Sequence, residues 1–462
     1  MVDEFRATFQ QLIDASVTAD PGQFPAAVHR VLVLASRIPV SERELALEAL
    51  APLLTGDHAA PGITADLCVV AGALVETGTD PGPAGPEVLR RLRAIGRGAI
   101  VFARAWQRTG GGEPPDPDSV TAADENRVAT DLGADAPGAT MCWWTVARHA
   151  LAAKTMLTRS TVRSHVRRDP TLHAELVAVA NQLGDHLPDL QEVRALLRMA
   201  EAGSALVLDR ESGRAFRVLF DGIGDNFQLH TLLADALVGP NGMGLAGDPP
   251  DPRWVRAFRD GDPDPAARTV RGWWNLVAHD GTWVWNEGVP AEIPTLDGEH
   301  VLVLDEQPYP RSWSAHRRHP LVAGWLEVEG ELLAEEAALW WKRVAPAEPA
   351  IPDPTDDSTP IPEPVLAEEA AGAERVRGFL PPEPEPEPLP RRPEAAPRPE
   401  PAPPEPAAPA EPPVPPAPAA RPEPARPAAA EPPAPPRTGG GTGLPPLPPG
   451  VSNSSAWGPT WR

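Results

Sequence analysis

The stretch Gly203-Ser-Ala-Leu-Val-Leu-Asp-Arg-Glu-Ser-Gly-Arg-Ala-Phe-Arg-Val-Leu-Phe220 marks a change in the pattern of this chain. Its two apolar runs predict two short strands, and Glu211-Ser-Gly213 between them predicts a turn. Upstream of this stretch, apolar residues recur at helical spacing instead. The change of period predicts an α+β protein, with a helical domain at residues 1–202 and a small, Trp-rich mixed α+β domain at residues 203–344.

The first 202 residues contain several amphipathic helical patterns separated by proline and glycine. Ser41-Glu-Arg-Glu44 is a capping box, which is typical of a helix start. Pro86 opens a longer helix whose apolar residues are spaced four and three apart: Val88, Leu92, Ile95, Ala99, Phe102 and Trp106. Because each stripe must be buried against another helix, the pattern predicts a helical bundle or an irregular α-repeat.

The pair Asp280-Gly281 is the strongest local signal in the second predicted domain, because it lies between two tryptophan-containing runs. An Asp-Gly pair is typical of a two-residue type I′ hairpin turn. Pairing about such a turn sets Ala278 opposite Trp283. Several indoles then share one face of the predicted hairpin.

Three indoles and one carboxylate on this face form a candidate ligand platform: Trp274, Trp283, Trp285 and Glu287. Indoles stack on sugars, cations and proline rings, but they also build the core of a small domain, and both interpretations stay open here. A carboxylate against an apolar wall has a raised pKa and could act as a general acid. An enzyme with a site near the hairpin is therefore an alternative. The sequence offers no catalytic partner for Glu287, and it predicts no cofactor and no metal site.

Residues 345–462 contain 38 of the 63 prolines of the chain. Proline lacks the backbone N–H that helices and sheets need, so this composition predicts a long disordered tail rich in Pro, Ala, Glu and Arg. Within it, Pro382-Glu-Pro-Glu-Pro-Glu-Pro388 predicts a stiff polyproline-II segment. Trp457 and Trp461 have no predicted core to join, so we interpret them as a candidate partner-binding motif.

Charge and composition exclude several classes of protein. The tail has 9 arginines, no lysine and 17 acidic residues, a net charge of −8, which leaves −15 of the total −23 for residues 1–344. An acidic surface repels nucleic-acid phosphates and anionic lipids, so both are disfavoured as partners, and no apolar run predicts a membrane span. Two cysteines are too few for a disulfide scaffold and favour the cytoplasm. The abundance of Ala, Pro, Gly and Arg is typical of high-GC bacteria.

The segment Leu151-Ala-Ala-Lys-Thr-Met-Leu-Thr-Arg-Ser-Thr-Val-Arg-Ser-His-Val-Arg-Arg168 contains stacked arginines. Its Thr-Val-Arg-Ser-His run resembles the recognition helix of LuxR-type helix-turn-helix domains. The resemblance implies a DNA-facing helix surface, and Arg159, Arg163 and Arg167 are the candidate anion or DNA contacts. Arginines on the wet face of a helix also pair with neighbouring carboxylates, which is the alternative for these residues.

Together these patterns favour an intracellular adaptor, an interaction protein that tethers another protein through its Pro-rich tail. In this hypothesis the stiff segment gives reach, and Trp457 and Trp461 make the contact. One alternative is a DNA-binding regulator acting through residues 150–168, and another is the enzyme near the hairpin. A further alternative is self-recognition, in which the tail covers the face that carries Trp283 and Trp285.

Overall fold

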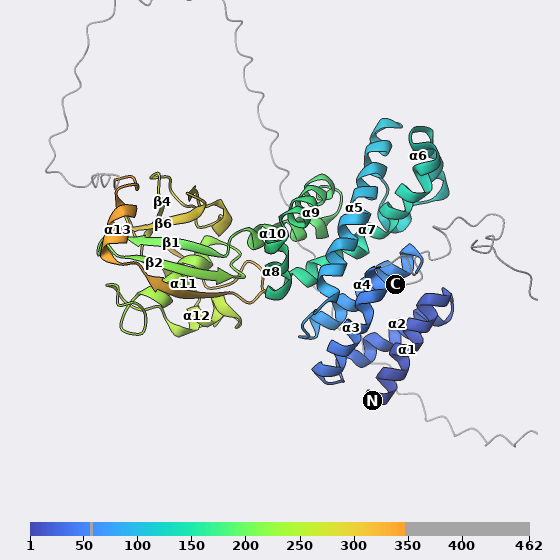
Figure 1. Ribbon diagram of the computed structural model, residues 1–462, viewed down its shortest axis with the longest axis horizontal. Coiled ribbons are helices and arrows are strands. Elements are labelled where there is room, and N and C mark those ends of the chain that lie inside the picture. Colours follow the sequence, from blue (N-terminus) through green and yellow to red (C-terminus); the bar gives the residue numbers. More distant parts are fainter. Residues whose placement is uncertain (56–58, 347–462) are drawn as a thin grey trace, which may run out of the picture. The chain divides into compact units, whose positions relative to one another are not determined.

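Helices fill the chain from Val2 to Glu201 in the computed structural model, which describes residues 1–55 and 59–346 (Figure 1). The α-helices are α1 (Val2–Thr18), α2 (Gln23–Ala35), α3 (Val40–Thr55), α4 (Pro61–Glu76), α5 (Ala84–Arg108), α6 (Ala122–Leu132), α7 (Ala136–Leu157), α8 (Ser160–Arg168), α9 (Pro170–Leu183) and α10 (Pro188–Glu201). Two short 3₁₀ turns, Pro117–Ser119 and Gly133–Asp135, flank α6. The predicted helical character of this part of the chain is confirmed.

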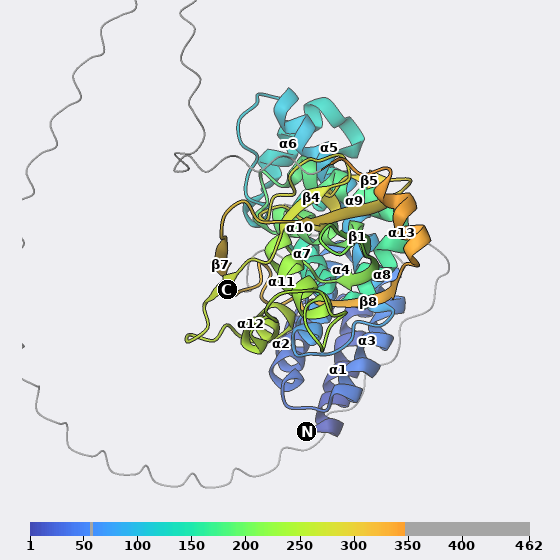
Figure 2. The same cartoon turned by 90° about the vertical axis from the view of Figure 1, so that its left-hand side faces the viewer.

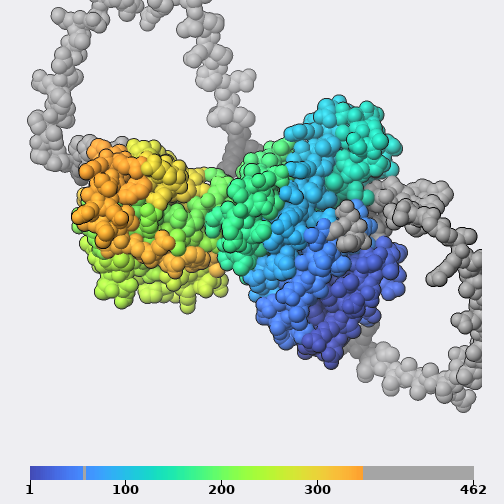
Figure 3. Space-filling model, in the orientation of Figure 1, coloured from blue at the N-terminus to red at the C-terminus, as the bar shows by residue number. Residues whose placement is uncertain are grey.

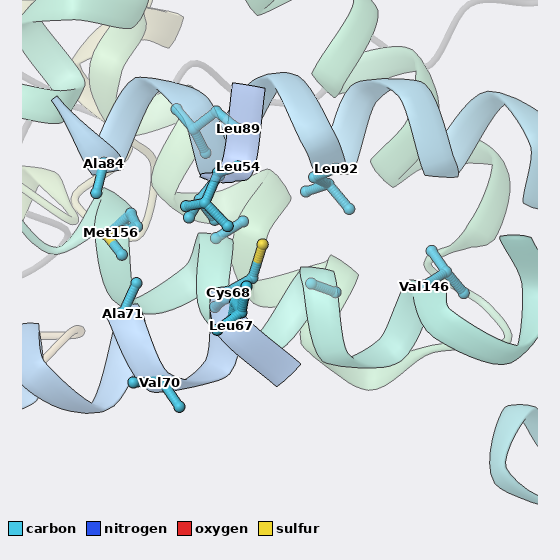
Figure 4. Packing of buried hydrophobic residues seen from close by; sticks show 14 of the residues in the cluster. Leu54, Leu67, Cys68, Val70, Ala71, Ala84, Leu89, Leu92, Val146 and Met156 are labelled. Carbon is cyan, nitrogen blue, oxygen red and sulfur yellow. The ribbon is translucent and has the colours of Figure 1, made fainter. Parts of the chain in front are cut away.

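Helices α5 and α7 form the centre of the helical part, where they run side by side (Figure 1). The predicted apolar seam of α5 is buried except for Ile95, which is partly exposed. Figure 4 shows how side chains of α3, α4, α5 and α7 interdigitate, with Leu54, Leu67, Leu92 and Val146 among those labelled. The helices are therefore held by the packing that the spacing of four and three predicts.

A glycine on α5 permits a close approach of α9. A Cβ atom at Gly96 would overlap the side chain of Val179, whereas a Cβ at Gly138 on α7 would meet no atom within 4 Å. We therefore expect Gly96→Ala to lower the free energy of unfolding by about 1–2 kcal/mol through overpacking. Gly138→Ala is the matched control, and it is expected to raise that free energy by about 0.5–1 kcal/mol through helix propensity. Urea denaturation followed by circular dichroism measures both; equal effects of the two substitutions would contradict the close approach.

A mixed sheet follows the helices and confirms the predicted α+β class. Its strands are β1 (Ser204–Asp209), β2 (Ala215–Asp221), β4 (Asn275–Ala278), β5 (Thr295–Leu296), β6 (Glu299–Asp305) and β8 (Trp325–Glu331). The main order is β4-β6-β1-β2-β8, with β5 also pairing with β6. Strands β1 and β6 are parallel, and the other pairs are antiparallel. A second, two-stranded sheet joins β3 (Thr269–Arg271) to β7 (Ser312–Ser314).

Helices cover both faces of the main sheet. They are α11 (Asn226–Leu237) and α12 (Pro252–Arg259) on one face and α13 (Ala334–Trp341) on the other (Figure 2). The alternation along β1 shows the reason, because Val207 packs in the α11 and α12 cluster while Leu206 and Leu208 pack in the α13 cluster. Helix α13 is amphipathic and leaves Leu339 exposed; its residues lie at the surface in orange in Figure 3.

The hairpin at Asp280-Gly281 forms, but its register differs from the prediction. Trp283 pairs with Val277, and the N–H of Ala278 donates to the carbonyl of Thr282. The loop therefore has three residues. Gly281 adopts the left-handed region with φ 88°, whereas Asp280 does not, so the positive φ that a type I′ turn requires at both central residues is absent. This one-residue shift moves the indoles to the other face of the strand.

A buried ion pair connects the helical part to the main sheet. Arg163 on α8 is 1% exposed and donates through Nη2 to Asp221 Oδ2 at 2.6 Å and through Nε to Oδ1 at 3.2 Å. Its Nη1 donates to the carbonyl of Leu157 at 2.8 Å. The half-exposed Arg167 also donates to Asp221 Oδ1, at 3.1 Å. Because Asp221 is the last residue of β2, this network fixes α8 against the end of that strand.

Candidate functional site

The register of the hairpin separates the predicted platform into two groups. Trp274 is 9% exposed and lies in the α11 and α12 cluster, where its ring stacks on His230 with centroids 5.6 Å apart. Trp283 and Trp285 are 39% and 63% exposed. Trp283 shares the face of its partner Val277, which packs in the α13 cluster. Trp274 thus serves the core, and the other two indoles are available at the surface.

Trp283 and Trp285 form a stacked pair on this surface. Their ring centroids are 4.7 Å apart and their planes differ by 20°. The guanidinium carbon of Arg311 lies over the Trp283 ring, 4.4 Å from its centroid. Arg311 also contacts the ring of Tyr309, 5.1 Å from its centroid.

We name these four residues, Trp283, Trp285, Tyr309 and Arg311, the aromatic–arginine surface. Several hydrogen bonds hold Arg311 in place. Its Nη2 donates to Asn275 Oδ1 at 2.9 Å, its backbone N–H donates to Gln307 Oε1 at 3.2 Å, and its carbonyl accepts from Gly272 at 2.9 Å. The cation is therefore pre-positioned beside the indole pair, and binding there costs little side-chain entropy.

An open pocket of about 490 Å³ adjoins Arg311. It is lined by Arg271, Gly272, Gln307, Pro310, Arg311 and Ser312. This lining contains two arginines and no carboxylate, although the chain as a whole carries a net charge of −23. A Cβ at Gly272 would lie 3.0 Å from the Trp313 ring, which explains why a glycine forms this wall. The two arginines of the pocket suit an anionic group of a ligand, and the neighbouring indoles suit an apolar group of the same ligand.

His230, on helix α11, holds the chain segment that leads into β4. Its ring is fully buried, and its Nε2 accepts the backbone N–H groups of Trp273 and Trp274 at 3.1 and 3.3 Å. Burial lowers the pKa of His230 to about 3, the nearby charge of Arg311 adds to the lowering, and the Asn286 amide opposes it. The neutral imidazole therefore anchors the chain that leads into β4, and it is a structural acceptor.

Glu287 lies in different surroundings from those that the sequence indicates. Its side chain is exposed, and its backbone carbonyl accepts from Arg318 Nη1 at 3.4 Å. The apolar wall on which the general-acid hypothesis depends is absent from this side chain. In the described ranges 1–55 and 59–346, no three His, Cys, Asp or Glu residues gather in a way that could hold a metal ion.

The three candidate DNA contacts are used inside the protein. Arg163 is buried against Asp221, and Arg167 donates to Asp221 and to the carbonyls of Ala200 and Ala202. Arg159 donates to the carbonyl of Val75. A recognition helix needs guanidinium groups that reach outward to phosphates and bases, and this arrangement turns them inward. Arg163 and Arg167 pair with the carboxylate of Asp221, whereas Arg159 contacts a backbone carbonyl.

A second pocket, of about 500 Å³, lies between the Glu113–Asp118 loop, α7 and the start of α10. The indole of Trp143 forms part of its wall, but Trp143 is 1% exposed and its Nε1 already donates to the carbonyl of Pro115. The acidic groups around it, including Asp189, face solvent or pair with neighbours such as Lys154. This pocket shows no converging donors for a ligand.

Trp457 and Trp461, together with the rest of the predicted tail from residue 347 onward, lie outside the described residues. Within the part of the chain that the structure describes, no helix has both the length and the apolar character needed to cross a bilayer. No family model, no curated protein and no solved structure matches this chain. The candidate site is therefore defined by its own geometry.

Proposed function

We propose that the protein is an adaptor that binds acidic, proline-rich peptides on its aromatic–arginine surface. The observation that carries this proposal is the exposed stack of Trp283 and Trp285 beside the pre-positioned Arg311. Aromatic side chains at a surface are the usual receptors for proline rings. A proline-rich peptide is already extended, so it loses little conformational entropy when it binds. An arginine next to them adds recognition of a carboxylate.

The sign of the charge favours an acidic peptide. Arg311 and Arg271 line the adjoining pocket, and Arg318 lies against the carbonyl of Glu287, two residues beyond Trp285. Arg311 itself lies over the Trp283 ring, in a chain whose net charge is strongly negative. Electrostatic complementarity raises the association rate and excludes basic peptides.

The tail supplies the second element of the proposed adaptor. Trp457 and Trp461 would contact a partner protein, and the proline-rich sequence before them would provide reach. We place this function in the bacterial cytoplasm, where Cys68 and Cys142 remain thiols, as they are in the structure. Burial raises the pKa of Cys68 to about 12, so this thiol is unreactive.

Trp285→Ala is the substitution that tests the proposed peptide site. A fluorescein-labelled Pro-Glu-Pro-Glu-Pro-Glu-Pro peptide is titrated with the full-length chain, and binding is followed by anisotropy. Because Trp285 is an exposed aromatic anchor, we expect its loss to weaken binding about tenfold or more without affecting the fold.

Trp325→Ala is the matched control. Trp325 is also exposed, at 41%, but it lies on β8, away from the aromatic–arginine surface. It is expected to bind the peptide as the wild type does. A second control peptide, Pro-Lys-Pro-Lys-Pro-Lys-Pro, is expected to bind weakly. Equal affinity of the two tryptophan variants, or of the two peptides, would disprove the proposed function.

A further inference from the structure

The described chain ends beside the aromatic–arginine surface. After α13, the backbone N–H of Ala345 donates to the carbonyl of His279 at 2.8 Å, and the carbonyl of Ala345 accepts from Arg210 Nη2 at 3.1 Å. A Cβ at Gly281 would lie 3.4 Å from the Cβ of Ala345. The chain therefore leaves the structure at the tip of the hairpin whose returning segment carries the exposed indoles.

The indoles and the point of departure lie on the same face of the sheet. Val277, which pairs with Trp283, packs in the α13 cluster, and so do the side chains of Trp341 and Val344. Residues that pair directly across an antiparallel ladder point to the same face. A chain leaving from Ala345 therefore reaches Trp283 without passing around the sheet.

The remaining sequence contains a segment with the chemistry that the surface selects. Pro382-Glu-Pro-Glu-Pro-Glu-Pro388 alternates proline with glutamate. In a polyproline-II helix, residues three apart share one edge and lie about 9 Å from each other. Each edge of this segment therefore presents a proline and a glutamate in alternation. One residue can contact an indole while the next along the same edge reaches an arginine.

The length of the intervening chain permits the contact. Thirty-six residues lie between Ala345 and Pro382, and a chain of that length spans up to about 110 Å at about 3.1 Å per residue. The tail as a whole carries a net charge of −8, and the pocket that adjoins Arg311 is lined by two arginines, so the charges are complementary. Tethering also gives the segment an effective concentration of about 1 mM at the surface. A free peptide of equal affinity must be present above this concentration to displace the segment.

We propose that Pro382–Pro388 of this same chain binds the aromatic–arginine surface, with prolines on the indoles and glutamates on Arg311 and Arg271. This inference rests on the proposed function, because it names an occupant of the same site. The bound segment competes with partner peptides. For a peptide with an intrinsic Kd of about 0.1 mM, a tethered competitor of equal affinity weakens the apparent affinity about tenfold. A partner must therefore displace the tail before it can bind.

The test uses the full-length chain and removes the three carboxylates of Pro382–Pro388. The variant is Glu383→Gln/Glu385→Gln/Glu387→Gln. The probe is the labelled Pro-Glu-Pro-Glu-Pro-Glu-Pro peptide, measured by anisotropy at low salt. We expect the variant to bind the probe about tenfold more tightly than the wild type, because the tethered competitor is weakened. The gain is expected to disappear when Trp285→Ala is added, since the site itself is then lost.

The matched control is Glu400→Gln/Glu405→Gln/Glu411→Gln, which makes the same charge change in the same tail outside the strict alternation. It is expected to bind the probe as the wild type does. An equal gain in both variants would overturn the assignment to Pro382–Pro388. A different result is that the wild type and both variants bind the probe equally well, and lose that binding when Trp285→Ala is added. That result would overturn the tethered contact, but the proposed function would stand. A gain that depends on protein concentration would show that the occupant comes from a second copy, and it would also overturn the proposal.

Discussion

Replacing Arg163 by alanine is expected to lower the free energy of unfolding by about 3–5 kcal/mol, because the substitution leaves the carboxylate of Asp221 buried with only one of its two arginine partners. Asp221 is 4% exposed as a side chain, and Arg163 supplies two of its charge-assisted hydrogen bonds. The carbonyl of Leu157 loses its donor at the same time. Urea denaturation of the full-length chain, followed by circular dichroism, measures the loss.

Arg167→Ala is the matched control for this prediction. Arg167 lies one helical turn further along α8 and also contacts Asp221, but it is partly exposed, so its removal is expected to cost about 1 kcal/mol. A loss below about 1 kcal/mol for Arg163→Ala would contradict the buried ion pair.

Acid is expected to destabilise the fold through His149 and His230, which are both buried. Burial lowers the pKa of His149 to about 4 and that of His230 to about 3, from an ordinary value of 6.5. The unfolded chain therefore takes up protons below pH 6.5 while the folded chain does not. Stability is present above pH 6.5 and is lost as the pH falls. Between pH 7.5 and pH 5, each histidine contributes about 2 kcal/mol to this loss.

His149→Gln isolates one of these contributions. Urea denaturation at pH 7.5 and at pH 5 gives the loss of unfolding free energy for each chain, and the carboxylates common to both chains cancel in the comparison. The variant is expected to lose about 2 kcal/mol less than the wild type over this range, since glutamine takes up no proton. The same loss in both chains would show that His149 is not held neutral by burial.

Local patterns predict most of the helical part. The spacing of four and three along α5 identifies its buried residues except at Ile95, which is partly exposed, and the alternation at Phe216, Val218 and Phe220 identifies β2. These elements were predictable because their burial depends on the periodicity of a single segment. The parallel pairing of β1 with β6 was not, since about ninety residues separate the two strands and no local signal marks it.

The hairpin shows how one residue of register changes a candidate site. The sequence Asp280-Gly281 correctly indicates a turn, but a two-residue and a three-residue loop are both compatible with it. The choice depends on whether Asp280 takes a positive φ, and it does not. Trp283 and Trp285 consequently lie on the face opposite Trp274, where they form a surface pair, while Trp274 packs in the core.

Tertiary partners could not be read from the segment around Arg163. Its helical spacing is compatible with an outward basic stripe and also with an inward ion pair. Asp221, which decides between them, lies 58 residues further along the chain. Arg311 was likewise not singled out as a partner of the indoles, because Asn275 and Gln307 position it only in the folded protein. His230 could have been noticed as a polar residue in an apolar helical run.

The central claim is that the aromatic–arginine surface binds acidic proline-rich peptides, and fluorine NMR of the full-length chain labelled with 5-fluorotryptophan tests it most directly. Single Trp283→Phe and Trp285→Phe variants assign the two resonances among the 14 tryptophans. On addition of the Pro-Glu-Pro-Glu-Pro-Glu-Pro peptide, we expect these two resonances to shift while that of Trp274 stays in place. Unchanged resonances of Trp283 and Trp285 at millimolar peptide would contradict the claim.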